Sequence, residues 1–326
     1  MRFHPSIRAV TLVLVAPVAA GAQASAFTQP PALSVPARLT VPSVRSAALP
    51  NGVELRIVEQ HELPLVQVTL TVRGGSRLDG TTPGLATFVA NMLDEGAGAR
   101  DALALQTELA YLGASLSTAA DWDRITVSLK VPVRTLDQAL ELMSDIALRP
   151  TFRAAEVRRQ RDLRLTNLLQ VRDQPGALAG LAFNQAVFPA SHPYHRSAQG
   201  DSASVAAFDS GGVRRFYEGV LRPERASLFV VGDIAEGQVR SLLNRRFGAW
   251  RAEGTATPVP TSAPAVSHPA ATRLPLVDKP DAAQSVIMIG WPGVDRSSPD
   301  YAALTVMNTL LGGSFSSRLM TNLRET

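Results

Sequence analysis

The chain has 326 residues, of which 45% are hydrophobic and 18% charged, a composition typical of folded globular proteins and not of disordered ones. Its formal net charge of +4 is scattered among acidic residues, which argues against a nucleic-acid-binding surface. Cysteine is absent, so disulfides, thiolate metal sites, a cysteine nucleophile and a lipid-modified cysteine are excluded for this sequence.

Residues 1–26 are predicted to form a secretory signal peptide. Arg2 and Arg8 are positive, an uncharged apolar run extends from Ala9 to Ala22, and small residues between Ala22 and Ala26 supply a cleavage site. The run is shorter than the roughly 20 residues of a spanning helix. We therefore expect an exported protein of the bacterial periplasm or cell envelope, without a stable membrane span. A mitochondrial transit peptide is the alternative, because no acid precedes Glu54.

Residues 27–48 are predicted to be a flexible lead-in, and residues 49–252 an N-terminal domain. Apolar alternation predicts strands at Val53–Val58, Leu65–Arg73, Ser115–Ala119, Ile125–Val131 and Ala226–Val231. Helical spacing predicts helices between Gly84 and Gly96, at Leu103–Leu112, Leu136–Leu148, Ala155–Val171 and Gly176–Phe188, around Val213–Tyr217, and at Gln238–Phe247. This order indicates an α+β sandwich in which helices pack on one face of an antiparallel or mixed sheet.

A linker rich in Ala, Pro, Thr, Ser and Val is predicted at residues 253–275, followed by the start of a second domain at 276–326. The second domain is predicted to open with a strand at Ser285–Trp291 and a helical stretch that ends at Gly313. Its pattern repeats that of the first domain, since Asp295 and Asn308 recur at nearly the same offset from Asp79 and Asn91. We expect an internal duplication whose second copy is truncated in this sequence.

Several short motifs together resemble one family, the insulinase/pitrilysin (inverzincin) zinc metallopeptidases. The motifs are Leu49-Pro50-Asn51-Gly52-Val53, Gly74-Gly75-Ser76-Arg77, Pro83-Gly84-Leu85-Ala86, His192-Pro193-Tyr194, Arg222-Pro223, Val230-Val231-Gly232-Asp233 and Phe315-Ser316-Ser317-Arg318-Leu319. The resemblance covers residues 49–326. It implies an α+β domain that is duplicated within the chain and closes like a clamshell around a peptide-binding chamber.

Active members of this family carry His-x-x-Glu-His on a helix, where two histidines bind zinc and the glutamate is the general base, while a later glutamate is the third ligand. The resemblance places the histidines at Thr87 and Asn91 and the base at Ala90. It places the third ligand at Asn167 and a supporting glutamate at Gln160. Hydroxyl and amide groups are poor zinc ligands, and Ala90 accepts no proton. We therefore predict a catalytically inactive chain that needs no zinc of its own.

Three other groups of polar residues are weaker candidates for a metal or catalytic site. His192 and His195 have metal-like spacing, but Pro193 disfavours a helix between them, and a loop is the simpler interpretation. Asp94 and Glu95 are interpreted as a solvated helix end. Ser314, Ser316 and Ser317 lie in a glycine-rich turn with no histidine nearby in sequence, and we interpret them as a loop.

Peptide binding is expected by resemblance alone, because family members add a peptide strand to a sheet edge. The matching residues are Ala114, Ser115, Leu116, Ser117, Thr118 and Ala119. The resemblance favours a non-catalytic subunit that contributes chamber wall and peptide contacts to an active, zinc-containing paralogue. The alternatives are an envelope scaffold without a proteolytic partner and a zinc endopeptidase that is active alone. The substrate-positioning Arg and Tyr of active members would follow Thr326.

Overall fold

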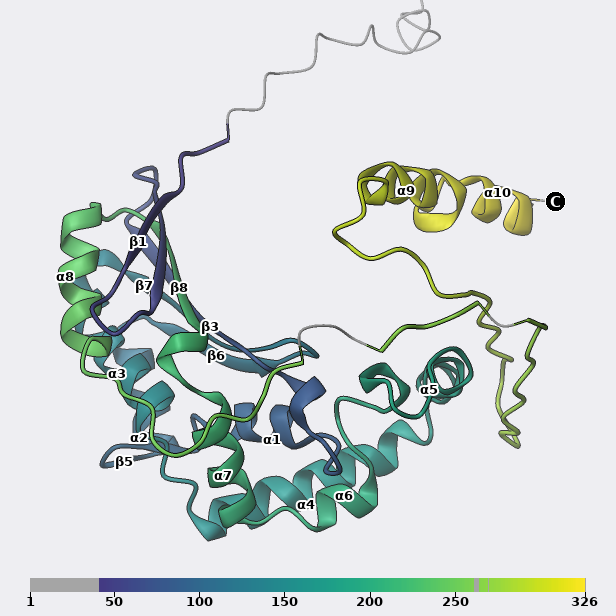
Figure 1. Cartoon of the computed structure of the whole chain (residues 1–326), viewed down its shortest axis with the longest axis horizontal. Helices are drawn as coiled ribbons and strands as arrows, with labels where there is room; N and C mark the ends of the chain where they lie inside the picture. The colour runs from purple at the N-terminus through teal and green to yellow at the C-terminus, as the bar shows by residue number, and fades with distance from the viewer. Residues whose placement is uncertain (1–40, 261–263, 269, 326) are drawn as a thin grey trace, which may run out of the picture. The chain divides into compact units, whose positions relative to one another are not determined.

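The computed structural model describes residues 41–260, 264–268 and 270–325. The predicted signal peptide and most of the predicted lead-in lie outside these residues. The unit from Ser43 to Thr326 contains the helices and strands labelled in Figure 1.

A six-stranded mixed sheet forms the centre of the α+β fold built by residues 45–247, which we call the domain, in the order β1-β2-β8-β3-β7-β6. The strands are β1 (Arg45–Ala48), β2 (Glu54–Glu59), β3 (Leu65–Arg73), β6 (Ser115–Ala120), β7 (Arg124–Pro132) and β8 (Ala226–Gly232). Strands β2 and β8 run parallel, and every other neighbouring pair is antiparallel. The predicted α+β class with a mixed sheet is therefore confirmed.

The two faces of the sheet differ in polarity, as the alternation in the sequence predicts. In β3, the side chains of Val66, Val68, Leu70 and Val72 are at most 1% exposed, whereas the intervening polar residues, beginning with Gln67, are exposed or half-buried. The buried face forms one continuous core with the helices. The other face carries mostly polar side chains toward solvent, together with Phe229 and Val231 of β8.

The helices of this domain that pack on the sheet gather on one of its sides (Figure 1). The helices of the domain are α1 (Leu85–Met92), α2 (Ala102–Tyr111), α3 (Leu136–Leu148), α4 (Ala154–Val171), α5 (Pro175–Val187), α6 (Ser202–Ala206), α7 (Ser210–Val220) and α8 (Glu236–Phe247). Helix α1 packs on β6 and β7, α3 packs on β7, and α8 packs on α3. Helix α1 also contacts α4, and these two helices frame the candidate site.

The fold begins earlier than the sequence predicts. Strand β1 starts at Arg45, inside the expected lead-in, and pairs with β2 through Arg45 opposite Ile57. Its sequence, Arg-Ser-Ala-Ala, has no apolar alternation, so the hydrogen-bonded ladder to β2 alone makes it a strand. The short hairpin β4 (Gly96–Ala97) and β5 (Arg100–Asp101) and the five-residue helix α6 were also not predicted.

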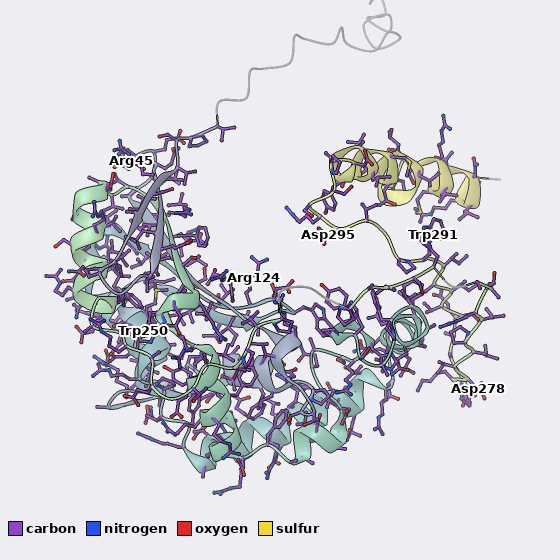
Figure 2. All side chains as sticks on the ribbon, in the orientation of Figure 1. Arg45, Arg124, Trp250, Asp278, Trp291 and Asp295 are labelled. Carbon is purple, nitrogen blue, oxygen red and sulfur yellow. The ribbon has the colours of Figure 1, made fainter. Side chains whose placement is uncertain are left out.

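The C-terminal segment contains helices without the expected strand. The predicted strand at Ser285–Trp291 is wrong: this stretch has no regular secondary structure and pairs with no strand, and Trp291 is exposed (Figure 2). A strand needs a neighbour for its backbone hydrogen bonds, and no ladder to it exists in the described part of the chain. The expected helical stretch is present as α9 (Tyr301–Asn308) and a π-turn that ends at Gly313, followed by α10 (Arg318–Glu325).

Among the described residues, no helix combines the length and the apolar character needed to cross a membrane.

Candidate functional site

Helix α1 begins where two loops meet. The Asp79 carboxylate accepts hydrogen bonds from the backbone N–H groups of Gly84 and Ala86, both at 2.8 Å. Gly84 and Gly200 have φ angles of 88° and 80°. A Cβ on Gly84 would lie 2.6 Å from Gly200 N, and one on Gly200 would lie 2.5 Å from Pro83 O. Glycine at both positions therefore lets the loop that ends at Gly200 contact the start of α1 through backbone alone.

A buried arginine joins this loop to two helices. Arg164, on α4, is 7% exposed and Thr87, on α1, is 4% exposed. Arg164 Nη1 donates to Thr87 Oγ1 at 3.2 Å and to the Gln199 carbonyl at 3.1 Å. Thr87 Oγ1 in turn donates to the Ala198 carbonyl at 2.7 Å. The threonine hydroxyl thereby acts as both acceptor and donor within the protein, with the Gly84 carbonyl at 3.0 Å as a second acceptor within reach of its proton.

Asn91 completes this arrangement one helical turn after Thr87. With its amide oriented to satisfy its neighbours, Asn91 Oδ1 accepts from Arg164 Nη2 at 2.9 Å, and Nδ2 donates to the Thr87 carbonyl at 3.2 Å. The Asn91 side chain lies at the surface, whereas Thr87 is buried below it. We call Arg164, Thr87, Asn91 and the carbonyls of Ala198 and Gln199 the Arg164 network.

The Arg164 network holds a positive charge among neutral groups. Its acceptors are a hydroxyl, an amide oxygen and a carbonyl oxygen. Burial lowers the pKa of Arg164, and no carboxylate in the described chain opposes that shift. A guanidinium stays charged at neutral pH even so, because its ordinary pKa exceeds about 12. The site therefore presents a fixed cation where α1 and α4 face each other.

The donor set at these positions does not fit a divalent metal ion. Zinc requires imidazole, thiolate or carboxylate ligands, and here the facing groups are a hydroxyl, an amide and a guanidinium. In the described ranges, no cluster of three or more His, Cys, Asp or Glu side chains is arranged to hold a metal. The Ala90 methyl is fully buried and offers no proton acceptor.

The two α4 residues predicted from the family resemblance lie differently. Gln160 Nε2 donates to the Glu95 carboxylate, and Arg159 forms an ion pair with the same carboxylate. Gln160 therefore ties α4 to the turn that follows α1. Asn167 is exposed on α4, three residues beyond Arg164. The structure thus brings Thr87, Asn91 and Arg164 together directly, whereas Gln160 bonds Glu95 in the turn after α1 and Asn167 faces solvent.

Sequence reasoning missed Arg164, the residue that joins the site. Helix α4 also carries Arg158, Arg159 and Arg161, so one more arginine draws no attention in a polar helix. The available signal was its spacing: Arg164 lies four residues after Gln160 and three before Asn167, which places it on the same helical face.

Strand β6 forms a free edge of the sheet. Within the described residues, β6 pairs with β7 and with no second neighbour. Ser115, Ser117 and Ala119 are exposed, whereas Leu116 and Ala120 pack against the core. The backbone groups of alternate residues on its outer side are therefore open to another strand. The predicted peptide-binding residues Ala114 to Ala119 coincide with this edge.

The other polar groups have structural partners. His192 Nδ1 accepts from the backbone N–H of Tyr194 at 3.1 Å, and His195 Nδ1 bonds the Phe188 carbonyl at 2.8 Å, so the two imidazoles serve different contacts. Asp94, predicted as part of a solvated helix end, is half-buried after α1, and this burial raises the pKa of its carboxyl group. The hydroxyl of Ser317 accepts from the Met320 N–H at 3.4 Å, at the start of α10.

The sequence and the fold both match proteins of one family. Residues 56–190 match the family described as Insulinase (Peptidase family M16), and residues 208–326 match the Peptidase M16 inactive domain. A protein named as an uncharacterized zinc protease of Mycobacterium leprae is 30% identical over 85% of this chain and 62% of its own length. The chain thus spans a little under two thirds of that relative.

Two further matches extend the comparison. Subunit 1 of the bovine (Bos taurus) cytochrome b-c1 complex is 24% identical over 84% of this chain and 56% of its own length. The crystal structure described as a peptidase M16 inactive domain from Pseudomonas fluorescens has a TM-score of 0.75 and 26% identity, covering 87% of this chain and 68% of that one. The sheet order, the helical face and these matches agree: the chain belongs to the insulinase family, peptidase family M16.

Proposed function

We propose that this chain is a non-catalytic member of the insulinase family that contributes chamber wall and peptide contacts to a zinc-containing partner chain. The observation that carries the proposal is the Arg164 network, because it places a cation against the two α1 positions, Thr87 and Asn91, where active members of the family carry histidines. Asn167, the position of the third ligand, carries an amide. In this proposal the family motif has been lost at all of these positions.

The zinc of the assembly belongs, in this proposal, to the partner. The relatives named as zinc proteases make the metal an expected feature of the family, but the donor set of this chain does not fit it. What this chain retains is the scaffold around the position: the glycine contact at Gly84 and Gly200, helix α4 and the exposed edge of β6. These elements form walls and strand edges, which need no metal.

Peptide binding is assigned to the β6 edge. An added strand forms main-chain hydrogen bonds to alternate residues of the edge and so demands little of the peptide sequence. The exposed side chains on β6 are small, Ser115, Ser117 and Ala119, and leave the approach to the backbone unobstructed. This edge suits extended polypeptides of varied sequence.

A subunit role is also supported by a relative. The bovine protein is named as a subunit of the cytochrome b-c1 complex, so that relative is part of an assembly. The same name supports the second candidate function, an envelope scaffold without a proteolytic partner. Location in the periplasm or envelope remains part of the proposal, based on the leader sequence of residues 1–26.

The purified mature chain is expected to bind no stoichiometric zinc and to cleave no peptide alone. Tagged protein recovered from its own cell envelope is expected to carry a second family member with an intact His-x-x-Glu-His motif. Metal analysis, a chelator-controlled cleavage assay and mass spectrometry of the co-purified chains check this. Chelator-sensitive turnover by the chain alone would overturn the proposal, and recovery within an envelope complex without any peptidase would favour the scaffold.

Binding at the β6 edge predicts an alternating response to backbone methylation of a peptide. A fluorescent octapeptide of alternating threonine and lysine, N-methylated at one position at a time, should lose affinity about fivefold at every second position, because each blocked main-chain hydrogen bond is worth about 1 kcal/mol. The intervening positions are the control, since their N–H groups point away from β6. Equal loss at all positions, measured by fluorescence anisotropy, would exclude strand addition.

A further inference from the structure

A small polar pocket lies beside the start of α1, apart from the Arg164 network. Its volume is about 200 Å³, and it is enclosed by the turn at residues 76–80, the loop at residues 190–197 and the tip of the β6–β7 hairpin. The side chains that matter for its chemistry are Arg77, Asp79, Trp122, His192 and Arg196. Neither the proposed peptide edge nor the family motif makes use of it.

His192 lines this pocket and carries a hydrogen-bond donor. The residue is 4% exposed, and its ring stacks on Phe188 with centroids 4.7 Å apart. Because Nδ1 accepts from the Tyr194 N–H at 3.1 Å, the neutral ring carries its proton on Nε2. Burial lowers the pKa of His192, which keeps the ring neutral at pH 7. Nε2 has no hydrogen-bond partner in the part of the chain that the structure describes.

Two arginines add positive charge to the same pocket. Arg77 Nη1 bonds Asp123 Oδ1 at 3.0 Å and Nη2 bonds the Pro260 carbonyl, but the buried Nε of Arg77 has no partner among the described residues. Arg196 Nη1 donates to the Gly80 carbonyl at 3.0 Å, which anchors a second guanidinium on the wall. Because this Nε atom has essentially no accessible surface, Arg77 acts on the pocket through the charge of its guanidinium and not through a hydrogen bond from Nε.

Asp79 restricts the charge that the pocket accepts. Its two carboxylate oxygens already bond the N–H groups of Gly84 and Ala86, and burial raises the pKa of Asp79 to about 7. A dianion such as phosphate would face this carboxylate at close range and be repelled. A monoanion is repelled less, because the repulsion scales with the charge of the ligand.

We propose that this pocket binds one carboxylate group, with the His192 imidazole as a hydrogen-bond donor and the Arg77 and Arg196 guanidinium groups as the attracting charges. The pocket volume suits a carboxylate with a short stem, such as the C-terminus of a peptide or an acidic side chain. Trp122 supplies an apolar wall for the stem. This inference does not depend on the proposed partner or on the β6 edge.

Four probes separate the sources of the carboxylate, with binding to the purified chain measured by calorimetry. They are an N-acetylated alanine tripeptide with a free C-terminus, its C-terminal amide, the same amide with glutamate in the middle, and sodium acetate. We expect at least one carboxylate probe to bind and the plain amide to bind at least about tenfold more weakly, the effect of one hydrogen bond to a charged group. Equal binding of the amide, or no binding of any carboxylate, overturns the proposal.

Variants test the named donors. His192→Phe keeps the aromatic stacking but removes the Nε2 donor, and Arg196→Gln removes the charged donor on the wall; each should weaken the best probe about tenfold. Arg124→Gln is the matched control: Arg124 projects from the same hairpin at the start of β7 (Figure 2), pairs with Asp121 and does not line the pocket. Unchanged affinity in both donor variants, or an equal loss in Arg124→Gln, contradicts the assignment. Near-ultraviolet circular dichroism checks that each variant is folded.

Discussion

Restoring the family's metal ligands is expected to fail while Arg164 remains. The variant with Thr87→His, Ala90→Glu, Asn91→His and Asn167→Glu should bind no stoichiometric zinc. Arg164 donates to both Thr87 and Asn91, at 3.2 and 2.9 Å, so its guanidinium would lie beside the new histidines. A dication and a monocation about 4 Å apart repel by about 8 kcal/mol at an effective dielectric constant of about 20. That repulsion exceeds the binding free energy that one or two of the new zinc ligands would contribute.

Adding Arg164→Met to those four substitutions should create the site. Methionine fills a similar volume without charge, and we expect zinc affinity to rise at least about a thousandfold over the four-substitution variant. Metal analysis of folded protein and thermal unfolding with and without zinc measure the change. Arg164→Met alone is the control and should bind no zinc.

Two outcomes would contradict this role of Arg164. Stoichiometric zinc in the four-substitution variant would show that Arg164 does not block the metal. A folded five-substitution variant that stays metal-free would show that Thr87, Asn91 and Asn167 are not the ligand positions.

Gly200→Ala is expected to destabilise the domain by about 3 to 5 kcal/mol. Alanine would have to adopt the left-handed backbone at φ 80°, and its Cβ would lie 2.5 Å from Pro83 O. The loop would move away from α1 and withdraw the Gln199 carbonyl from Arg164. Denaturant unfolding of the variant measures the loss.

Glycines elsewhere provide the control for this effect. Gly237→Ala, in α8, meets nothing within 4 Å and should change stability by less than about 1 kcal/mol, in the stabilising direction. Gly84→Ala should lower the free energy of unfolding about as much as Gly200→Ala. The double variant should lower it by less than the sum of the two single effects, because both substitutions disrupt the same contact. Full additivity would show that the two glycines act independently.

The regular elements were predictable because their sequence pattern matches their burial. The alternation in Leu65–Arg73 and the helical spacing in Leu136–Leu148 predict the bounds of β3 and α3 as the structure has them. Strand β1 was not predictable, since its pairing with β2 and not its own residues makes it a strand. Ser285–Trp291 shows the reverse case, where a strand-like sequence lacks a neighbouring strand in the described chain.

The candidate site was predictable only in part, for a related reason. Thr87, Ala90 and Asn91 were found because a family motif defines their positions on one helix. Arg164 reaches them from another helix, far along the chain from Thr87, and no local pattern reports which side chain of α4 enters that space. The contact is tertiary, so it became visible only when both helices were placed.

Strand β8 separates two strands that are neighbours in the sequence. It lies between β2 and β3 and pairs with both, although it ends only at Gly232, and in this domain only α8 follows it. Until it is synthesised, β1 and β2 on one side and β3, β7 and β6 on the other have no common strand. Folding of this domain therefore depends on contacts between distant residues, which makes it slow, and a chain that emerges from the ribosome cannot close its sheet until nearly the whole domain is made.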